Sequence, residues 1–101
     1  MAAHAAVLVM DLRLPASRSL KERRAALRPI LDGARHRFAV SVAETGHQDS
    51  WQRAEVAFAS VGSTPTRVTE ELDAVERFVW SFPETEVLAA SRHWVEVDVP
   101  G

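Results

Sequence analysis

The hydrophobic residues of this chain repeat at two different intervals, and the order of these intervals is the feature that most constrains the fold. Where every second residue is apolar, one face of a β-strand is expected to be buried. Where apolar residues recur three and four positions apart, the pattern indicates a helix that packs one side against a core. The strand pattern is predicted for residues 5–14, 38–44, 51–61 and 86–97, and the helix pattern follows Ser19 and Thr64.

The predicted order of elements is therefore β-α-β-β-α-β. Two β-α-β halves of this kind close into a four-stranded antiparallel sheet with both helices on one face, which is the ferredoxin-like α+β arrangement. The inward face of the last strand is ambiguous by period alone. The first strand is expected to face the core with Leu8, Met10, Leu12 and Leu14.

Both helices have recognisable starts. Ser19 and Glu22 form a capping box, in which the Ser19 hydroxyl accepts from the Glu22 amide and the Glu22 carboxylate reaches the Ser19 amide. Thr64 followed by Pro65 suits an N-cap and a first helical position. Pro29 removes one donor from the first helix, but the apolar stripe stays in phase across it. One bent helix is therefore expected rather than two, and the second helix is expected to run to about residue 82.

A chain of 101 residues is long enough for one domain with a modest core, so residues 1–101 are expected to form a single domain. The absence of cysteine excludes a disulfide framework and thiolate metal sites, and it fits a reducing compartment. No apolar run approaches the roughly 18–20 residues of a membrane span. The N-terminus lacks the basic segment of a signal peptide. These features predict a cytoplasmic protein.

Charge is segregated along the chain. Residues 1–40 carry eight basic and three acidic side chains, whereas residues 41–101 carry four basic and eleven acidic ones. A basic stripe along the first helix could follow a phosphate backbone, and the simpler alternative is a solvated helix face beside a core stripe. Arg23 is expected to be partly buried against an acid such as Glu44. The candidate nucleic-acid-binding residues are Arg18, Lys21, Arg24, Arg28 and Arg35.

The sheet face opposite the helices must meet solvent, a ligand or another subunit. Its expected residues are small and β-branched, and they would form a flat apolar patch of the kind that a second subunit covers. The alternative is an exposed face with a charged rim, at residues such as Asp11 and Arg53. The first strand offers no aromatic side chain for stacking on a base, so RRM-like RNA binding is not expected there. The candidate oligomer residues are Val7, Val9, Ala43, Ala57 and Ala59.

Glu44, His47 and Asp49 gather around the predicted turn between the second and third strands. An imidazole and two carboxylates could ligate a divalent metal or act as acid and base. The simpler interpretation is an ordinary turn in which Asp49 hydrogen-bonds its own backbone. The sequence contains no glycine-rich phosphate loop and no nucleophile motif. We therefore expect no catalytic residue, no metal and no cofactor, and a protein that is not an enzyme.

The three tryptophans fall in different predicted environments. Trp51 and Trp94 are expected to be packing anchors for the sheet or its rim, because an indole buries a large area. Trp80 falls opposite the apolar stripe of the second helix. It is therefore a candidate contact residue in solvent, with packing against a loop as the alternative.

Three consecutive motifs together resemble one known family. They are Leu-Pro-x-Ser-x-Ser-Leu-Lys-Glu-Arg-Arg at residues 14–24, Phe-x-Val-Ser-Val-Ala-Glu at residues 38–44, and His-Gln-Asp-x-Trp-Gln-Arg-Ala at residues 47–54. The chain resembles the DUF503, or YlxP-like, family over essentially its whole length. The resemblance implies a small bacterial ferredoxin-like protein of uncharacterised function, often encoded beside translation-initiation and ribosome-maturation factors. It supplies no catalytic residues.

Two main hypotheses about function follow. The first is a non-enzymatic cytoplasmic binding factor that contacts ribosomal RNA, the ribosome or ribosome-maturation factors through its first helix. The second is a dimeric ferredoxin-like scaffold or small-ligand sensor that uses the open sheet face with Trp51 or Trp94. A metal-dependent enzyme at the hairpin turn is a third, weaker alternative, and no membrane partner is expected.

Overall fold

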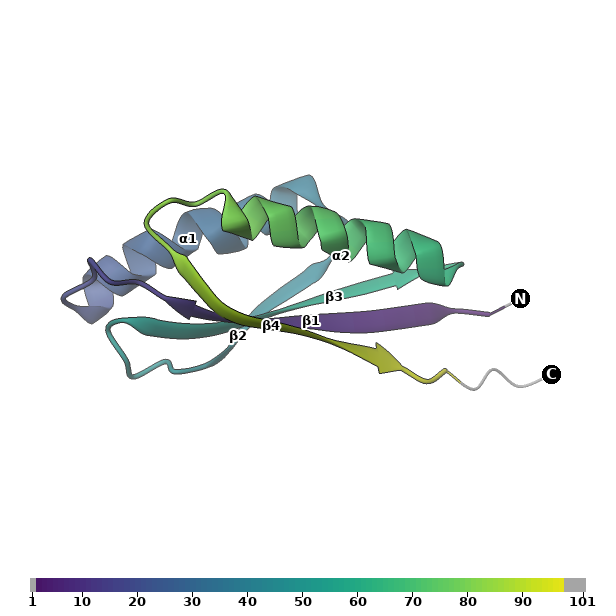
Figure 1. Ribbon diagram of the computed structural model, residues 1–101, viewed down its shortest axis with the longest axis horizontal. Helices are drawn as coiled ribbons and strands as arrows, with labels where there is room; N and C mark the ends of the chain where they lie inside the picture. Colours follow the sequence, from purple (N-terminus) through teal and green to yellow (C-terminus); the bar gives the residue numbers. More distant parts are fainter. Residues whose placement is uncertain (1, 98–101) are drawn as a thin grey trace.

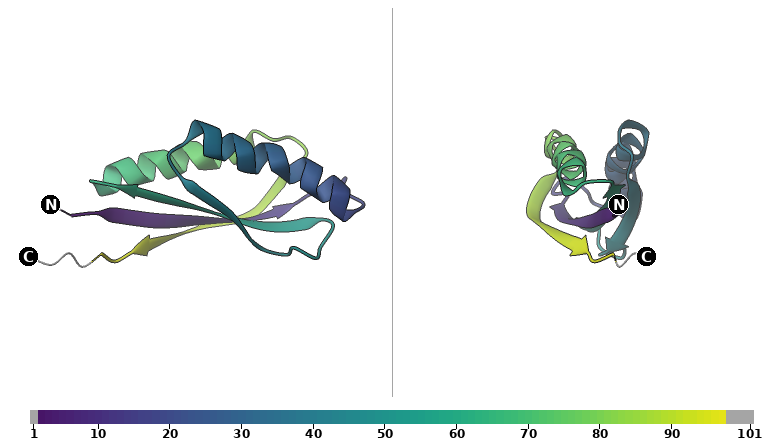
Figure 2. Two further views of the ribbon diagram at one scale, coloured as in Figure 1. Left: turned by 180° about the vertical axis from the view of Figure 1, so that it is seen from behind. Right: turned by 90° about the vertical axis from the view of Figure 1, so that its right-hand side faces the viewer.

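The computed structural model describes residues 2–97, in which four strands and two helices follow one another in the predicted order (Figure 1). The strands form one sheet in the order β2-β3-β1-β4, and every neighbouring pair is antiparallel. Both helices lie on one face of this sheet (Figure 2), which confirms the ferredoxin-like α+β prediction. The elements are β1 (His4–Arg13), α1 (Leu20–Arg37), β2 (Ser41–Gly46), β3 (Arg53–Gly62), α2 (Pro65–Trp80) and β4 (Glu86–Val95).

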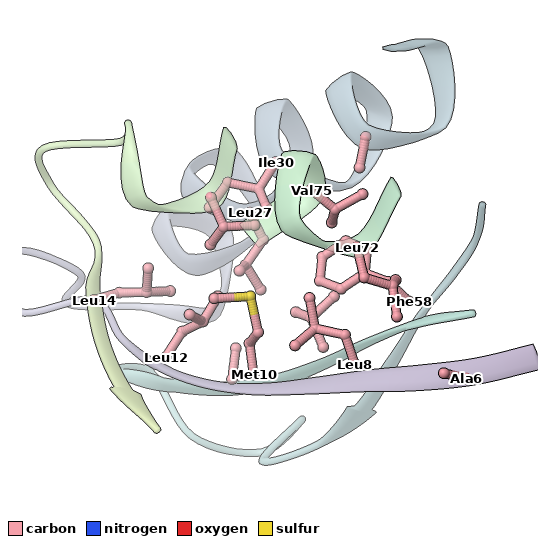
Figure 3. Packing of buried hydrophobic residues seen from close by; sticks show 14 of the residues in the cluster. Ala6, Leu8, Met10, Leu12, Leu14, Leu27, Ile30, Phe58, Leu72 and Val75 are labelled. Carbon is pink, nitrogen blue, oxygen red and sulfur yellow. The ribbon is translucent and has the colours of Figure 1, made fainter. Parts of the chain in front are cut away.

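The core lies between the sheet and the two helices (Figure 3). Alternate residues of the central strands β1 and β3 are fully buried there, as the period-two pattern predicts. Fully burying one large apolar side chain contributes roughly 1.5–3 kcal/mol, so this layer is the main source of stability. Its members are Ala6, Leu8, Met10, Leu12 and Leu14, then Leu27, Ile30 and Ala34, then Ala54, Val56 and Phe58, and finally Val68, Leu72, Val75 and Val79.

The helix starts agree with the sequence, with one difference in the first cap. The Ser19 hydroxyl accepts from the Glu22 amide at 3.1 Å, as a capping box requires. The Glu22 carboxylate accepts from the Ser19 hydroxyl at 3.4 Å and from the Arg18 amide at 3.3 Å, instead of from the Ser19 amide. At α2, the Thr64 hydroxyl accepts from the Arg67 amide at 3.2 Å.

The boundary between α1 and β2 differs from the prediction. The strand was expected from Phe38, but it begins at Ser41 because the Phe38 amide still donates to the Ala34 carbonyl at 3.1 Å and closes the helix. As predicted, α1 is a single helix across Pro29. Leu20 occupies the first helical position, outside the core cluster, and is 37% exposed.

The two helices meet at Gly33 and Phe78. A Cβ atom at Gly33 would lie 2.5 Å from Cζ of the Phe78 ring, so any larger residue would push that ring away. The ring packs edge-on against Phe38 and Phe82, with centroid distances of 5.7 and 5.1 Å. The Arg37 guanidinium lies 5.0 Å from the Phe78 centroid. This glycine therefore allows the close approach that holds α1 beside α2.

The face of β4 that the sequence left ambiguous is set by an irregularity in its pairing with β1. Leu12 pairs with Val87, whereas Asp11 pairs with Ala89, so Leu88 is an additional residue on β4. An inserted residue exchanges the two faces of a strand from that point on. The helix side of β4 consequently carries Val87, Ala90, Arg92 and Trp94.

Candidate functional site

One arginine of α1 belongs to the interior. The Arg23 side chain is 4% exposed, and its guanidinium forms an ion pair with the Glu44 carboxylate. It also donates to the carbonyls of His47 and Arg53, each at 3.1 Å. A buried guanidinium needs partners for its donors, and these come from β2, the following turn and the start of β3. The expected contact between Arg23 and Glu44 is confirmed.

Among the described residues, four further arginines pair with acids of the same chain. Arg35 lies 3.2 Å from Asp32 and also donates to the Val42 carbonyl at 3.2 Å. The sequence grouped Arg35 with the candidate nucleic-acid-binding residues, but the structure engages it in holding α1 to β2. The other pairs are Arg13 with Glu86, Arg53 with Asp11, and Arg92 with Asp73 and Glu76.

The remaining candidate cations form an exposed row on α1. Lys21, Arg24 and Arg28 are spaced three and four positions apart, so their side chains project from the same side of the helix. Arg18 lies just before the helix. All four are exposed, and none forms an ion pair within residues 2–97. We call Arg18, Lys21, Arg24 and Arg28 the basic ridge.

The basic ridge borders a shallow groove between α1 and the edge strand β2. The groove has a volume of about 180 Å³. Both acids that line it are already paired with arginines, Glu44 with Arg23 and Asp32 with Arg35. The ridge cations beside it therefore remain available to an anionic group. The lining residues are Arg24, Leu27, Arg28, Leu31, Asp32 and Glu44.

The turn after β2 does not bring Glu44, His47 and Asp49 together into one site. Glu44 is bound to α1, whereas the His47 ring lies 3.7 Å from an oxygen of Asp11 on the open sheet face. Within residues 2–97, no group of three or more histidine, aspartate or glutamate side chains is arranged to hold a metal ion. The geometry therefore gives no support to the metal or acid–base alternative at this turn.

The turn is closed by Ser50 rather than by Asp49. The Ser50 amide donates to the His47 carbonyl at 3.0 Å, and its hydroxyl accepts from the amides of Gln52 and Arg53 at 3.3 and 3.1 Å. His47 adopts the left-handed backbone conformation, with φ of 59°. This conformation is uncommon outside glycine but enriched in histidine. The prediction that Asp49 fixes the turn through its own backbone is therefore corrected.

The five candidate oligomer residues lie on the sheet face away from the helices, as expected. Val9, Ala57 and Ala43 pair across three strands, and Val7 pairs with Ala59 in the next row. Each of them is exposed or half-buried. The row is flat because its side chains are small. Whether a second subunit covers it stays a prediction.

One end of the open face is polar. The Arg53 guanidinium lies 2.6 Å from Asp11 Oδ2, as expected for a charged rim. Within the described part of the chain, Asp11 Oδ1 and Arg53 Nε are buried without a hydrogen-bond partner. The apolar rows therefore end against an ion pair.

All three tryptophans are substantially exposed. Trp80 is 59% exposed, which confirms the prediction that it faces solvent. Trp51 and Trp94 are 56% and 50% exposed, so the prediction that they are packing anchors is wrong. Trp51 lies in the turn before β3, and Trp94 lies on an edge strand, so each indole is covered only in part.

An ionic cluster at the opposite edge of the sheet was missed by sequence reasoning. Arg92 of β4 reaches α2, where it lies 2.6 Å from Asp73 and 3.3 Å from Glu76. Together with Arg77 and Trp80, these residues line a hollow of about 180 Å³. The sequence does show two acids one turn apart on α2. It does not show that Arg92 faces them, because the bulge in β4 changes the face on which Arg92 lies.

A third hollow has few side chains that could bind a ligand or take part in a reaction. This hollow, of about 300 Å³, lies where β1 leads into α1, and it is lined mainly by small and apolar residues. Its Glu22 carboxylate already serves the helix cap. Within the described residues, no helix has both the length and the apolar character needed to cross a membrane.

Comparison with known proteins agrees with the motifs. The sequence profile described as "Protein of unknown function (DUF503)" matches residues 5–92, which include the basic ridge. The "Uncharacterized protein YlxP" of Bacillus subtilis (strain 168) is 42% identical over 76 residues. That alignment covers 75% of this chain and 83% of the relative.

Proposed function

This chain belongs to the DUF503 family of proteins of unknown function, and we propose that it is a non-catalytic cytoplasmic protein that binds RNA. In this proposal the basic ridge contacts the phosphate backbone. Ribosomal RNA is the first RNA to test, because the family that the motifs resemble is often encoded beside ribosome-maturation factors.

The observation that supports this proposal most is the difference between arginines that have acidic partners and the exposed cations of the basic ridge. Five arginines have acidic partners within the chain, whereas the four members of the basic ridge are exposed without one in residues 2–97. Arg37, Arg67 and Arg77 are also exposed without such a partner there, but they lie at three separate helix ends, whereas the ridge gathers four cations at one helix. Exposed cations that neutralise phosphates release condensed counterions, and this release drives sequence-independent binding. The ridge is therefore suited to a polyanion.

The spacing of the ridge fits an extended ligand. Lys21 and Arg28 are seven residues apart, which corresponds to about 10 Å along the helix axis. Arginine presents several N–H groups in one plane and can bind a phosphate with two hydrogen bonds. Arg24 and Arg28 stand at the groove beside β2, where a phosphate can approach both.

The acids of α2 limit the contact to one side of the molecule. Glu70, Glu71, Asp73 and Glu76 all lie on α2, and Arg92 pairs with only the last two. Repulsion between this helix and a phosphate backbone disfavours wrapping of RNA around both helices. We therefore expect RNA to track α1 and the β2 edge.

The open sheet face gives no reason to expect base-specific recognition. RRM domains stack bases on aromatic side chains of the central strands. The corresponding rows here carry Val7, Val9, Ala57 and Ala59. The proposed binding is therefore directed at the backbone and depends strongly on salt.

Two charge-reversal variants with the same net charge test the proposal. Arg24→Glu with Arg28→Glu reverses two ridge cations, whereas Arg67→Glu with Arg77→Glu reverses two exposed arginines of α2. The probe is a fluorescein-labelled fragment of ribosomal RNA, titrated with protein at 50 mM salt. We expect the ridge variant to lose at least 100-fold in affinity and the α2 variant to lose less than fivefold, since each ridge cation contacts a phosphate.

Two results would contradict the proposal. One is wild-type protein that does not bind the RNA at 50 mM salt. The other is an equal loss of affinity in both variants, because this would show a response to bulk charge instead of a defined site. Adding Lys21→Glu to the ridge variant should abolish co-sedimentation with small ribosomal subunits.

The second candidate function is a dimeric scaffold that uses the open sheet face. The observation in its favour is the flat pair of rows formed by Val7 with Ala59 and by Val9 with Ala57. Replacing Ala57 with arginine would place a charge at the centre of these rows. A dimer that depends on this face should then dissociate in sedimentation velocity.

A further inference from the structure

The edge strand β4 carries one protective feature, the bulge at Leu88, but it has little other cover against strand pairing. Such edges are commonly short or guarded by charged side chains. β4 has ten residues, and within residues 2–97 no side chain hydrogen-bonds to its backbone. Its Arg92 turns back onto α2, and its Glu86 pairs with Arg13 of β1. Beyond the bulge, from Ala89 to Val95, the backbone edge is therefore left open.

Exposed apolar side chains concentrate along this edge. Residues 80–97 contain five of the eight large hydrophobic residues that are exposed in the described part of the chain. Exposed large hydrophobic residues in such a number near one edge favour an interaction surface there. The five are Trp80, Leu88, Trp94, Val95 and Val97.

We propose that β4 pairs antiparallel with β4 of a second copy of this chain, so that two sheets form one continuous eight-stranded sheet. The two-fold axis passes near Ser91, at the middle of the strand. Main-chain hydrogen bonds supply the pairing, as in other cases of strand addition. This surface is separate from the basic ridge and from the open sheet face, and the inference does not depend on RNA binding.

The two ends of β4 are complementary to each other. Trp80 ends α2, which leads into the start of β4, whereas Trp94 lies near the end of the strand. Antiparallel pairing around Ser91 brings Trp94 of the second copy opposite Leu88 and toward Trp80. Because the axis is two-fold, the same contact forms twice. Four half-exposed indoles are thereby covered, which favours a second copy over an unrelated strand.

The charged side chain nearest the proposed axis does not oppose the pairing. Arg92, the charge nearest the proposed axis on the helix side, is already bonded to Asp73 and Glu76. An ion pair that enters an interface with its partners in place avoids the large penalty of an unpaired buried charge. The arginine therefore needs no rearrangement when a second copy approaches.

The available area is sufficient for a stable dimer. A ten-residue strand is about 33 Å long, and the strand with its flanking helix presents a strip roughly 20 Å high. The strip corresponds to about 650 Å² per subunit, within the range of ordinary specific interfaces. The area is near the lower end of that range, and we expect dissociation at micromolar concentrations.

The first test compares tryptophans. Trp80→Ala and Trp94→Ala should each raise the dimer dissociation constant at least about 30-fold in sedimentation equilibrium, because central aromatic anchors dominate such interfaces. Trp51→Ala is the matched control, since the exposure of Trp51 falls between those of Trp80 and Trp94 but Trp51 lies in the turn before β3. It should change the constant less than twofold. Ala57→Arg should also leave the dimer intact.

The second test uses single cysteines, which the cysteine-free sequence makes unambiguous. Directly opposed residues of antiparallel strands have Cα atoms about 4.5–5.5 Å apart, within the range that a disulfide spans. Ser91→Cys should therefore give a covalent dimer under mild oxidation. Cysteines at Ala57, on the open face, and at Ser41, on β2, should remain monomeric on denaturing gels.

Several outcomes would overturn the inference. They are a monomer at 100 µM wild-type protein, a dimer unaffected by both Trp80→Ala and Trp94→Ala, and a dimer that Ala57→Arg dissociates. Cross-linking through the cysteine at Ala57 or Ser41 but not at Ser91 would place the contact on another surface and would overturn it as well.

Discussion

Each edge of the sheet is bordered by a helix and tied to it by an arginine. The two edges differ in how far side chains cover their backbone. At β2, the side chains of Arg35 and Gln48 donate to the carbonyls of Val42 and Glu44, and the strand has only six residues. At β4, ten residues run without such cover beside exposed tryptophans. The first edge projects cations into water, and the second presents apolar surface.

The difference shows how one topology can separate two kinds of recognition. A guarded edge cannot add a strand, so its outward charges remain free for a polyanion. An unguarded apolar edge has little attraction for phosphate but can pair with another strand. The β2 side is therefore the proposed RNA side, and the β4 side is the proposed subunit interface.

The largest expected effect tests the two arginine anchors against each other. Arg23→Ala removes a buried guanidinium and leaves Glu44 and two carbonyls without their partner, so it should lower the free energy of unfolding by about 3 kcal/mol. Arg92→Ala removes a more exposed anchor and should cost about 1 kcal/mol or less. Urea unfolding measures both. Equal costs would show that the edges are not anchored differently.

A salt titration distinguishes the two surfaces next. With four ridge cations on a single-stranded RNA, raising salt from 50 to 200 mM should weaken RNA binding about 50-fold. Dimerisation through β4 buries apolar side chains and an already paired arginine, so its dissociation constant should change less than threefold over the same range. Fluorescence anisotropy and sedimentation equilibrium report the two constants. A steep salt dependence of the dimer would contradict the apolar character assigned to β4.

The smallest expected effect compares the two helix caps. Ser19 has a reciprocal arrangement with Glu22, whereas Thr64 accepts only from the Arg67 amide. Ser19→Ala should lower the free energy of unfolding by about 1 kcal/mol, and Thr64→Ala by about half as much. Thermal and urea unfolding can resolve both. A larger cost for Thr64→Ala than for Ser19→Ala would mean that the Glu22 contacts do not strengthen the cap of α1.

The parts of the fold that the sequence predicts are those governed by local pattern. Period two assigned Leu8 and Met10 to the core, and the capping signals identified the start of both helices. The buried contact between Arg23 and Glu44 was foreseen because the helical position of Arg23 lies near the apolar side. The basic ridge was likewise visible from spacing, although the engagement of Arg35 with β2 was not.

The features that the sequence did not reveal depend on pairing between distant residues. The bulge at Leu88 exists only in relation to β1, and it decides that Arg92 and Trp94 face the helices. The alternation of apolar residues within β4 does not reveal this register shift, because the shift is defined by pairing with β1. The closure of the turn by Ser50 was missed because serine and aspartate are both common turn acceptors.

The buried Arg23 also has a consequence for how the chain folds and opens. Its partners lie 21, 24 and 30 residues further along the chain, so none of its bonds can form until α1 and the β2–β3 hairpin have docked. Contacts over such separations consolidate late and together. Amide hydrogens of α1 and of this hairpin should accordingly exchange as one cooperative unit, with matching protection.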